Sequence, residues 1–171
     1  TANVTINVGN VNDNNPNIAD VTVAKDEDIT PGTEITDLND ASGGDTDADG
    51  SALSYAITGG NGDGLFAINK TTGSITLASG QALDYESKTS HTLTISATAA
   101  DGGSPDTANV TINVGNVNDN DPSISLARSG LPVAENITPD IVIADLSDAS
   151  GGDTDADSSP LTYAITGGND D

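Results

Sequence analysis

An internal repeat, copied almost without change, constrains the fold of this chain more than any other feature. The sequence TANVTINVGNVNDN fills residues 1–14 and recurs at residues 107–120, a shift of 106 positions. The sequence DASGGDTDAD at residues 40–49 returns at residues 148–157, a shift of 108 positions. Since two different motifs return at nearly the same distance, the chain is built from repeats of a little over a hundred residues.

A third motif fixes the phase of the repeat. YAITGGN at residues 55–61 returns at residues 163–169, again with a shift of 108. We therefore predict the last strand and linker of one repeat at 1–14, a complete repeat at 15–121, and the first half of the following repeat at 122–171. The chain is expected to be a window from a longer array.

The apolar residues of the complete repeat have a period of two, which is typical of strands with one buried face. In HTLTISATA, residues 91–99, Leu93, Ile95 and Ala97 share one side and hydroxyl residues occupy the other. Shorter runs of this kind lie at 18–23, 34–38, 53–58, 65–68, 74–77 and 108–114. Clusters of Gly, Asn and Asp separate them. Seven short strands predict an all-β fold, a tandem seven-stranded Greek-key β-sandwich of immunoglobulin-like topology.

The charge of the chain limits its partners. It has 27 Asp and Glu against 4 Lys and Arg, a formal net charge of −23, which disfavours a compact state by self-repulsion. Nucleic acid and anionic membrane surfaces are excluded as expected partners because both require basic patches, and no apolar run approaches the roughly 20 residues of a spanning helix. With no cysteine, a metal is the expected staple.

The acidic residues gather in turns and at strand ends, whereas the outward strand faces carry Thr, Ser and Asn. Oxygen-only ligand sets of this kind suit hard cations, Ca²⁺ in particular. Zinc or iron would prefer His or Cys, and the single histidine, His91, lies inside a strand pattern. We interpret His91 as a structural surface or strand residue, and we predict Ca²⁺ as the cofactor.

A self-contained Ca²⁺ loop is the competing interpretation of the sequence DTDADG. Asp45, Asp47, Asp49 and Gly50 match positions one, three, five and six of the helical Ca²⁺ loop. That loop needs a Glu at position twelve, where this chain has Ala56. Its flanks are also predicted strands rather than helices, so the self-contained loop is disfavoured.

Four motifs in order give the chain a family resemblance. They are Glu27 followed by the PGT of residues 31–33, the DAD of 47–49, the LDYE of 83–86, and the DGGSP of 101–105 before the next NDNDP junction. Together they resemble the cadherin repeat in its bacterial form. The resemblance implies a seven-stranded sandwich that binds Ca²⁺ between successive repeats.

The resemblance also implies which residues are metal ligands. At the junction after the complete repeat they are Glu27, Asp84, Glu86, Asn116, Asn118, Asp119, Asn120, Asp155 and Asp157. At the earlier junction they are Asn12, Asp13, Asn14, Asp47, Asp49 and Asp101. One departure is that the family opens its linker with Asp, where this chain has Asn10 and Asn116.

These features predict a Ca²⁺-rigidified stalk or adhesive segment of a large extracellular bacterial surface protein, for cell adhesion, biofilm or matrix attachment. The expected partners are neighbouring repeats of the same chain, with homotypic copies or surface polysaccharide as further candidates. Near-identity between copies suits a spacer better than an enzyme. Catalysis is not expected, because the acidic pair Asp84 and Glu86 is accompanied by no cleft-forming insertion.

Two other functions stay open from the sequence. The first is a Ca²⁺-dependent carbohydrate-binding module, for which the complete repeat offers the aromatic residues Tyr55, Phe66 and Tyr85. The second is a filament-forming subunit, in which the strand at residues 1–8 of one molecule pairs with the open half repeat at 122–171 of another.

Overall fold

The chain folds into two units that contain only β-strands, turns and extended segments among the described residues. In this computed structural model the described residues are 1–11, 13–39, 44–124, 133–140 and 153–167. The first unit covers Thr1–Val117 and the second covers Asn118–Asp171. Over the described ranges, no helix has the length and apolarity needed to cross a membrane.

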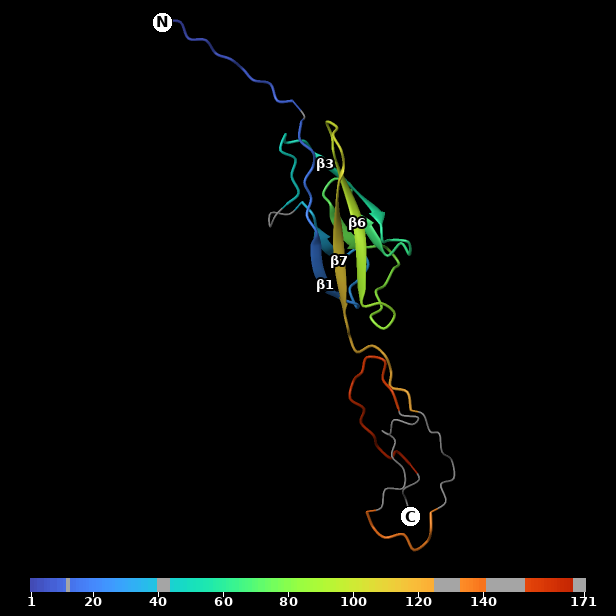
Figure 1. Cartoon of the computed structure of the whole chain (residues 1–171). Helices are drawn as coiled ribbons and strands as arrows, with labels where there is room; N and C mark the ends of the chain where they lie inside the picture. The colour runs from blue at the N-terminus through green and yellow to red at the C-terminus, as the bar shows by residue number, and fades with distance from the viewer. Residues whose placement is uncertain (12, 40–43, 125–132, 141–152, 168–171) are drawn as a thin grey trace. The chain divides into compact units, whose positions relative to one another are not determined.

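Seven strands in the first unit form a β-sandwich (Figure 1). They are β1 (Val21–Asp26), β2 (Glu34–Asp37), β3 (Leu53–Gly59), β4 (Phe66–Ile68), β5 (Ser74–Leu77), β6 (Ser90–Ala99) and β7 (Asp106–Gly115). One sheet has the order β1-β7-β6-β3 and the other has the order β2-β5-β4. β1 runs parallel to β7, and the other pairs are antiparallel. The predicted all-β sandwich is confirmed.

The core lies between the two sheets and consists mainly of aliphatic side chains. Ile75 and Leu77 of β5 and Leu93, Ile95 and Ile112 of β6 and β7 are all 0% exposed. The burial alternates along β6, with hydroxyl residues on the outer face, as the period of two predicts. Removing this apolar surface from water is the main favourable contribution to folding.

His91 belongs to this core. It lies in β6, as predicted, but it is only 3% exposed, so the surface alternative is wrong. Its ring packs edge-on against Phe66, with ring centroids 5.2 Å apart. Burial lowers the pKa of His91, Lys88 lowers it further, and Asp63 acts in the opposite direction. The period of two does place His91 on the face of Leu93 and Ile95, but a histidine at the end of a strand is as often exposed as buried, so the residue type alone did not decide its burial.

Residues 17–20, which precede β1, are hydrogen-bonded to the DAD turn and to the start of β7. Asn17 pairs with Thr46 in an antiparallel bridge, with N···O distances of 2.8 and 3.1 Å. The backbone N–H of Ile18 donates to Asp106 at 2.9 Å, and that of Asn109 donates to Asp20 at 2.7 Å. These contacts place the chain that precedes β1 beside the DAD turn.

The second unit reproduces the start of this arrangement. Ser123 pairs with Thr154 in an antiparallel bridge, the counterpart of the bridge between Asn17 and Thr46, with N···O distances of 2.7 and 3.0 Å. Residues 161–167, the counterpart of β3, form no strand. Its side chains Tyr163 and Ile165 are 43% and 77% exposed.

Candidate metal centre

The second aspartate of the DAD motif holds the linker within the first unit. The Asp49 carboxylate accepts the backbone N–H groups of Asp13 at 3.1 Å and Asn14 at 2.9 Å. The Asn14 amide also donates to Asp49 Oδ1 at 3.2 Å and to Asp13 at 2.8 Å. These hydrogen bonds, those from Asn14 above all, lower the pKa of Asp49. The carboxylate is therefore held in its charged form.

Asn10 shows why the departure from the family pattern is tolerated. Its side-chain amide donates to the backbone oxygen of Asp49 at 3.1 Å. An ionised aspartate has no proton to donate and could not make this contact. The substitution thus exchanges a charge for a hydrogen bond that ties the start of the linker to the DAD turn.

The first aspartate of the motif is placed differently. Asp47 Oδ1 accepts the backbone N–H of Asp49 at 2.9 Å, which closes the turn. Within the described part of the chain, Asp47 Oδ2 is buried and has no hydrogen-bond partner. Since buried carboxylate oxygens are normally paired, this atom is suited to bind a cation.

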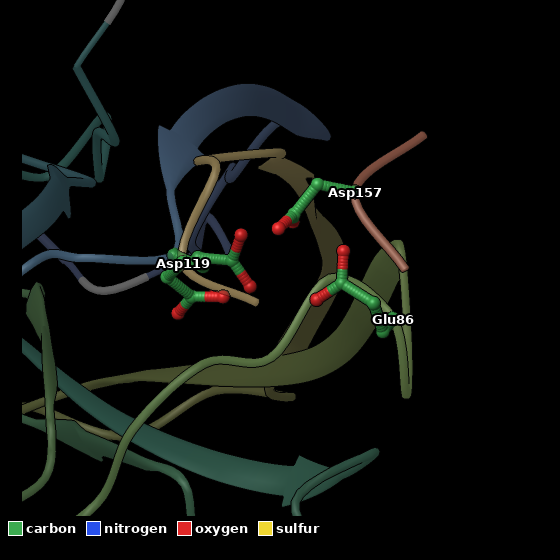
Figure 2. Close-up of side chains that lie close together, drawn as sticks. Glu86, Asp119 and Asp157 are labelled. Atoms are coloured by element: carbon green, nitrogen blue, oxygen red, sulfur yellow. The ribbon is translucent and has the colours of Figure 1, made fainter. Parts of the chain in front are cut away.

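The second unit repeats the contact between linker and DAD motif. The backbone N–H of Asn120 donates to Asp157 Oδ2 at 2.7 Å, and the Asn120 amide donates to Asp119 at 2.8 Å. Figure 2 shows the side chains of Asp119 and Asp157, which each place a carboxylate oxygen within 4.8 Å of the other. Asp157 is 7% exposed. Two like charges this close repel unless a cation or proton lies nearby.

Glu27 and Glu86 form a second acidic pair at the end of the first unit from which β7 leaves. Their carboxylate oxygens lie within 4.8 Å of each other. Glu27 is 5% exposed, and its carboxylate accepts the backbone N–H groups of Tyr85 at 2.6 Å and Val117 at 2.8 Å. Glu86 is exposed. Glu27 thereby ties the LDYE turn to the residues that follow β7.

Asp84 and Asp101 are both exposed, but Asp84 is hydrogen-bonded within its own turn and Asp101 is hydrogen-bonded to a distant segment. Asp84 accepts the backbone N–H and the hydroxyl of Ser87, both at 2.8 Å, and these bonds lower its pKa. Asp101 accepts the hydroxyl of Ser51. That contact joins the DGGSP turn to the residues just after the DAD motif.

The remaining predicted ligands differ in their exposure and in their hydrogen bonds. Asn116 and Asn118 are exposed beside the end of β7, and Asp155 is half-buried in the second DAD motif. Asp155 Oδ1 is 3.4 Å from the backbone nitrogen of Ser159, which donates to it. Asn12 lies outside the described residues. No signal in the sequence indicated that Asp49 and Glu27 would each accept two backbone N–H groups.

The donor set fits Ca²⁺. The candidate ligands are carboxylates and amide carbonyls, the oxygen donors that Ca²⁺ takes in groups of six to eight. The buried oxygen of Asp47 has no hydrogen-bond partner among the described residues, and two carboxylate pairs each lie within 4.8 Å. The residues present therefore suit a hard divalent cation better than zinc, which prefers His and Cys.

These features define a class of protein: a β-sandwich module whose acidic turns hold linker segments rich in oxygen donors. The cadherin domain model matches residues 21–115, which is more than half of the chain. The chain belongs to the cadherin family. Cadherin domains are extracellular adhesion modules that bind Ca²⁺, and they are not enzymes.

Relatives and solved structures agree with this assignment. Human Protocadherin Fat 1 is 34% identical over 176 residues, covering 99% of this chain and 4% of the relative. Mouse Protocadherin Fat 4 is 35% identical over 172 residues, covering 98% of this chain and 3% of the relative. The structure of mouse Cadherin-23 EC22-24 has a TM-score of 0.54 at 33% identity, covering 67% of this chain and 37% of that chain.

The structure of Protocadherin Gamma B7 extracellular cadherin domains 1-4 has a TM-score of 0.60 at 25% identity. It covers 74% of this chain and 30% of that chain. This chain spans 3–4% of the length of the two protocadherin relatives named above. Those relatives are animal proteins, so a bacterial origin stays a prediction.

Proposed function

We propose that the chain is a Ca²⁺-rigidified stalk or adhesive segment of a large bacterial surface protein, acting in cell adhesion, biofilm or matrix attachment. The observation that supports this most is that the same hydrogen bond between linker and DAD motif occurs in both units. Asn14 is bonded to Asp49 in one unit and Asn120 is bonded to Asp157 in the other, at 2.9 and 2.7 Å. A spacer built from repeats needs the same linker structure between each pair of repeats, whereas an enzyme needs a single active site.

The proposed metal sites are the two junctions. The ligands after the complete repeat are Glu27, Asp84, Glu86, Asn116, Asn118, Asp119, Asn120, Asp155 and Asp157. The ligands at the earlier junction are Asn12, Asp13, Asn14, Asp47, Asp49 and Asp101. A bound ion would supply positive charge that offsets the repulsion within each carboxylate pair and part of the net charge of −23.

The partners proposed are the neighbouring repeats of the same chain and, through them, homotypic copies. A sugar-binding platform has less support, because such platforms expose aromatic rings and two of the three candidates are in the core. Tyr55 is 2% exposed and Phe66 is 4% exposed. The carbohydrate-binding alternative therefore retains only the half-buried Tyr85 in the complete repeat.

Small-angle scattering tests the stiffening directly. In millimolar Ca²⁺ the chain should show a larger maximum dimension and a narrower distance distribution than in excess EDTA. Extracellular Ca²⁺ modules have dissociation constants of about 10⁻⁴ to 10⁻³ M, so the change should occur in that range. An identical scattering profile in both buffers would contradict the proposal.

Calorimetric titration tests the ligands. Asp119→Ala should lower the number of Ca²⁺ ions bound per chain or weaken their affinity about tenfold or more. Asp63→Ala removes the same charge from an exposed turn between β3 and β4 and serves as the matched control. If both variants weaken binding equally, general charge rather than a built site attracts the ions.

A further inference from the structure

The linker between the two units is fixed at both ends by hydrogen bonds that require no metal. At its start, the backbone N–H of Val117 donates to Glu27 of the first unit at 2.8 Å. At its end, the backbone N–H of Asn120 donates to Asp157 of the second unit at 2.7 Å. Each contact lies within one unit, and the boundary between the units falls between Val117 and Asn118.

The contact between Asn120 and Asp157 also occurs in the earlier copy of the DAD motif. In the earlier copy, Asp49 Oδ2 accepts the N–H groups of Asp13 and Asn14 at 3.1 and 2.9 Å. The Asn14 amide lies 3.2 Å from Asp49 Oδ1, and the Asn120 amide lies 3.4 Å from Asp157 Oδ1. The contact thus recurs in two units whose other surroundings differ.

Continuity with the sheet strengthens the first contact. The backbone N–H of Glu27 donates to the Gly115 oxygen at 3.0 Å, which extends the parallel pairing of β1 and β7 by one bond. The Glu27 side chain then takes up the next available donor, Val117. With 5% exposure, this carboxylate is shielded from water, so its hydrogen bonds are stronger than those of an exposed group.

From these contacts we propose that Glu27 and Asp157 act as metal-independent clamps, and that the calcium-free linker pivots between Val117 and Asn120, at Asn118 and Asp119. The inference deepens the proposed function, on which it rests for the role of the linker as a calcium junction. Val117 moves with the preceding repeat, and Asn120 moves with the following one. Calcium would then have to immobilise only the two residues between the clamped N–H groups, rather than a long flexible linker.

The two aspartates of the first DAD motif consequently have different roles. Asp49 and Asp157 are positioning residues, because their carboxylates already accept linker N–H groups. Asp47, whose buried Oδ2 has no hydrogen-bond partner among the described residues, has a carboxylate oxygen available to an ion. Charge-assisted hydrogen bonds to backbone N–H groups are strong enough to hold the linker while the ion is absent.

Amide exchange measured by NMR in excess EDTA tests the clamps on the whole chain. The amides of Val117 and Asn120 should exchange about tenfold or more slowly than unprotected amides, while Asn118 and Asp119 should be the most mobile linker residues. Asp157→Ala should abolish protection at Asn120 and leave Val117 protected. Asp157→Asn retains an acceptor oxygen and should restore most of the protection. The matched pair Asp49→Ala and Asp49→Asn should act on Asp13 and Asn14, and should leave Val117 and Asn120 unchanged.

The outcomes separate this inference from the proposed function, since every measurement is made without calcium. Unprotected Asn120 in the unmodified chain, or equal exchange in Asp157→Ala and the unmodified chain, would overturn the second clamp. Glu27→Gln keeps an acceptor oxygen and should retain most of the protection of Val117, whereas unchanged protection in Glu27→Ala would overturn the first clamp. Failure of calcium binding would instead remove the proposed function and leave the exchange pattern intact.

Discussion

The sequence TANVTINVG occurs twice and has two different structures. In its second occurrence, from Thr107, it forms most of β7, and Val110 and Ile112 are 0% exposed. In its first occurrence, from Thr1, it forms no strand, and Val4 and Ile6 are 84% and 81% exposed (Figure 1). Identical residues with identical intrinsic preferences thus differ completely in burial.

The difference teaches that the neighbouring strands decide whether this segment is a strand. β7 pairs with both β1 and β6, and no strand of the described structure pairs with residues 1–8. β propensity chiefly reflects packing against such neighbours. The linker that follows this segment has the same contact in both copies. The backbone N–H groups of Asn14 and Asn120 each donate to the second aspartate of the following DAD motif. Linker geometry is local, whereas strand geometry is not.

The largest expected effect comes from changing the same residue in both copies. Ile112→Ala should lower the free energy of unfolding by about 2–5 kcal/mol, because it leaves a cavity between the sheets. Ile6→Ala, its matched control, should change it by less than about 0.5 kcal/mol. Urea unfolding followed by circular dichroism measures both. Equal losses in the two variants would mean that residues 1–8 are packed in solution.

Substituting a turn glycine should have a smaller effect on the free energy of unfolding, and it again compares the first unit with the second. Gly60 follows β3 with a φ of 80°, and a Cβ there would overlap the Thr92 backbone oxygen of β6. Gly60→Ala should therefore cost about 1–3 kcal/mol of unfolding free energy through overpacking. Gly167, the counterpart of Gly59 in the second unit, has nothing within 4 Å of the place that a Cβ would occupy, and Gly167→Ala should be neutral. A neutral Gly60→Ala would show that β3 and β6 are not paired as described.

The smallest effect is a pH dependence confined to the first unit. Burial lowers the pKa of His91 below its ordinary value of 6.5, so the unfolded chain binds a proton more readily than the folded one. Stability is therefore complete above about pH 6.5 and falls as the pH drops through 6.5 toward the lowered pKa. Thermal unfolding between pH 7.5 and 5 should show the loss, and His91→Phe should remove most of it. An unchanged slope in His91→Phe would assign the loss to other groups.

Much of the fold follows from the sequence because the longest strands of the complete repeat, β6 and β7, alternate between buried and more exposed residues. The predicted strand at 74–77 coincides with β5, and that at 91–99 falls within β6. The predicted strand at 18–23 is displaced from β1, which starts at Val21, and Asn17, just before the predicted strand, bridges to Thr46 instead. Alternation identifies a buried face but says little about where pairing begins.

The candidate site was harder to predict than the strands. Motif spacing selected the candidate acidic residues, but it could not show which hydrogen bonds each carboxylate already accepts. Glu27 accepts N–H groups from Tyr85 and Val117, which lie 58 and 90 residues further along the chain. Such contacts depend on the finished sandwich. The ligand list as a whole stays a prediction that the titration of Asp119→Ala can test.

The parallel pairing of β1 with β7 has a mechanical consequence. Because the first and last strands of the sandwich run in the same direction, the chain enters the first unit at one end and leaves it at the other. A pulling force applied through the two ends then acts along both strands and loads their paired residues, from Val21 with Val110 to Asp26 with Gly115, in shear. All those hydrogen bonds resist tension together instead of opening one after another.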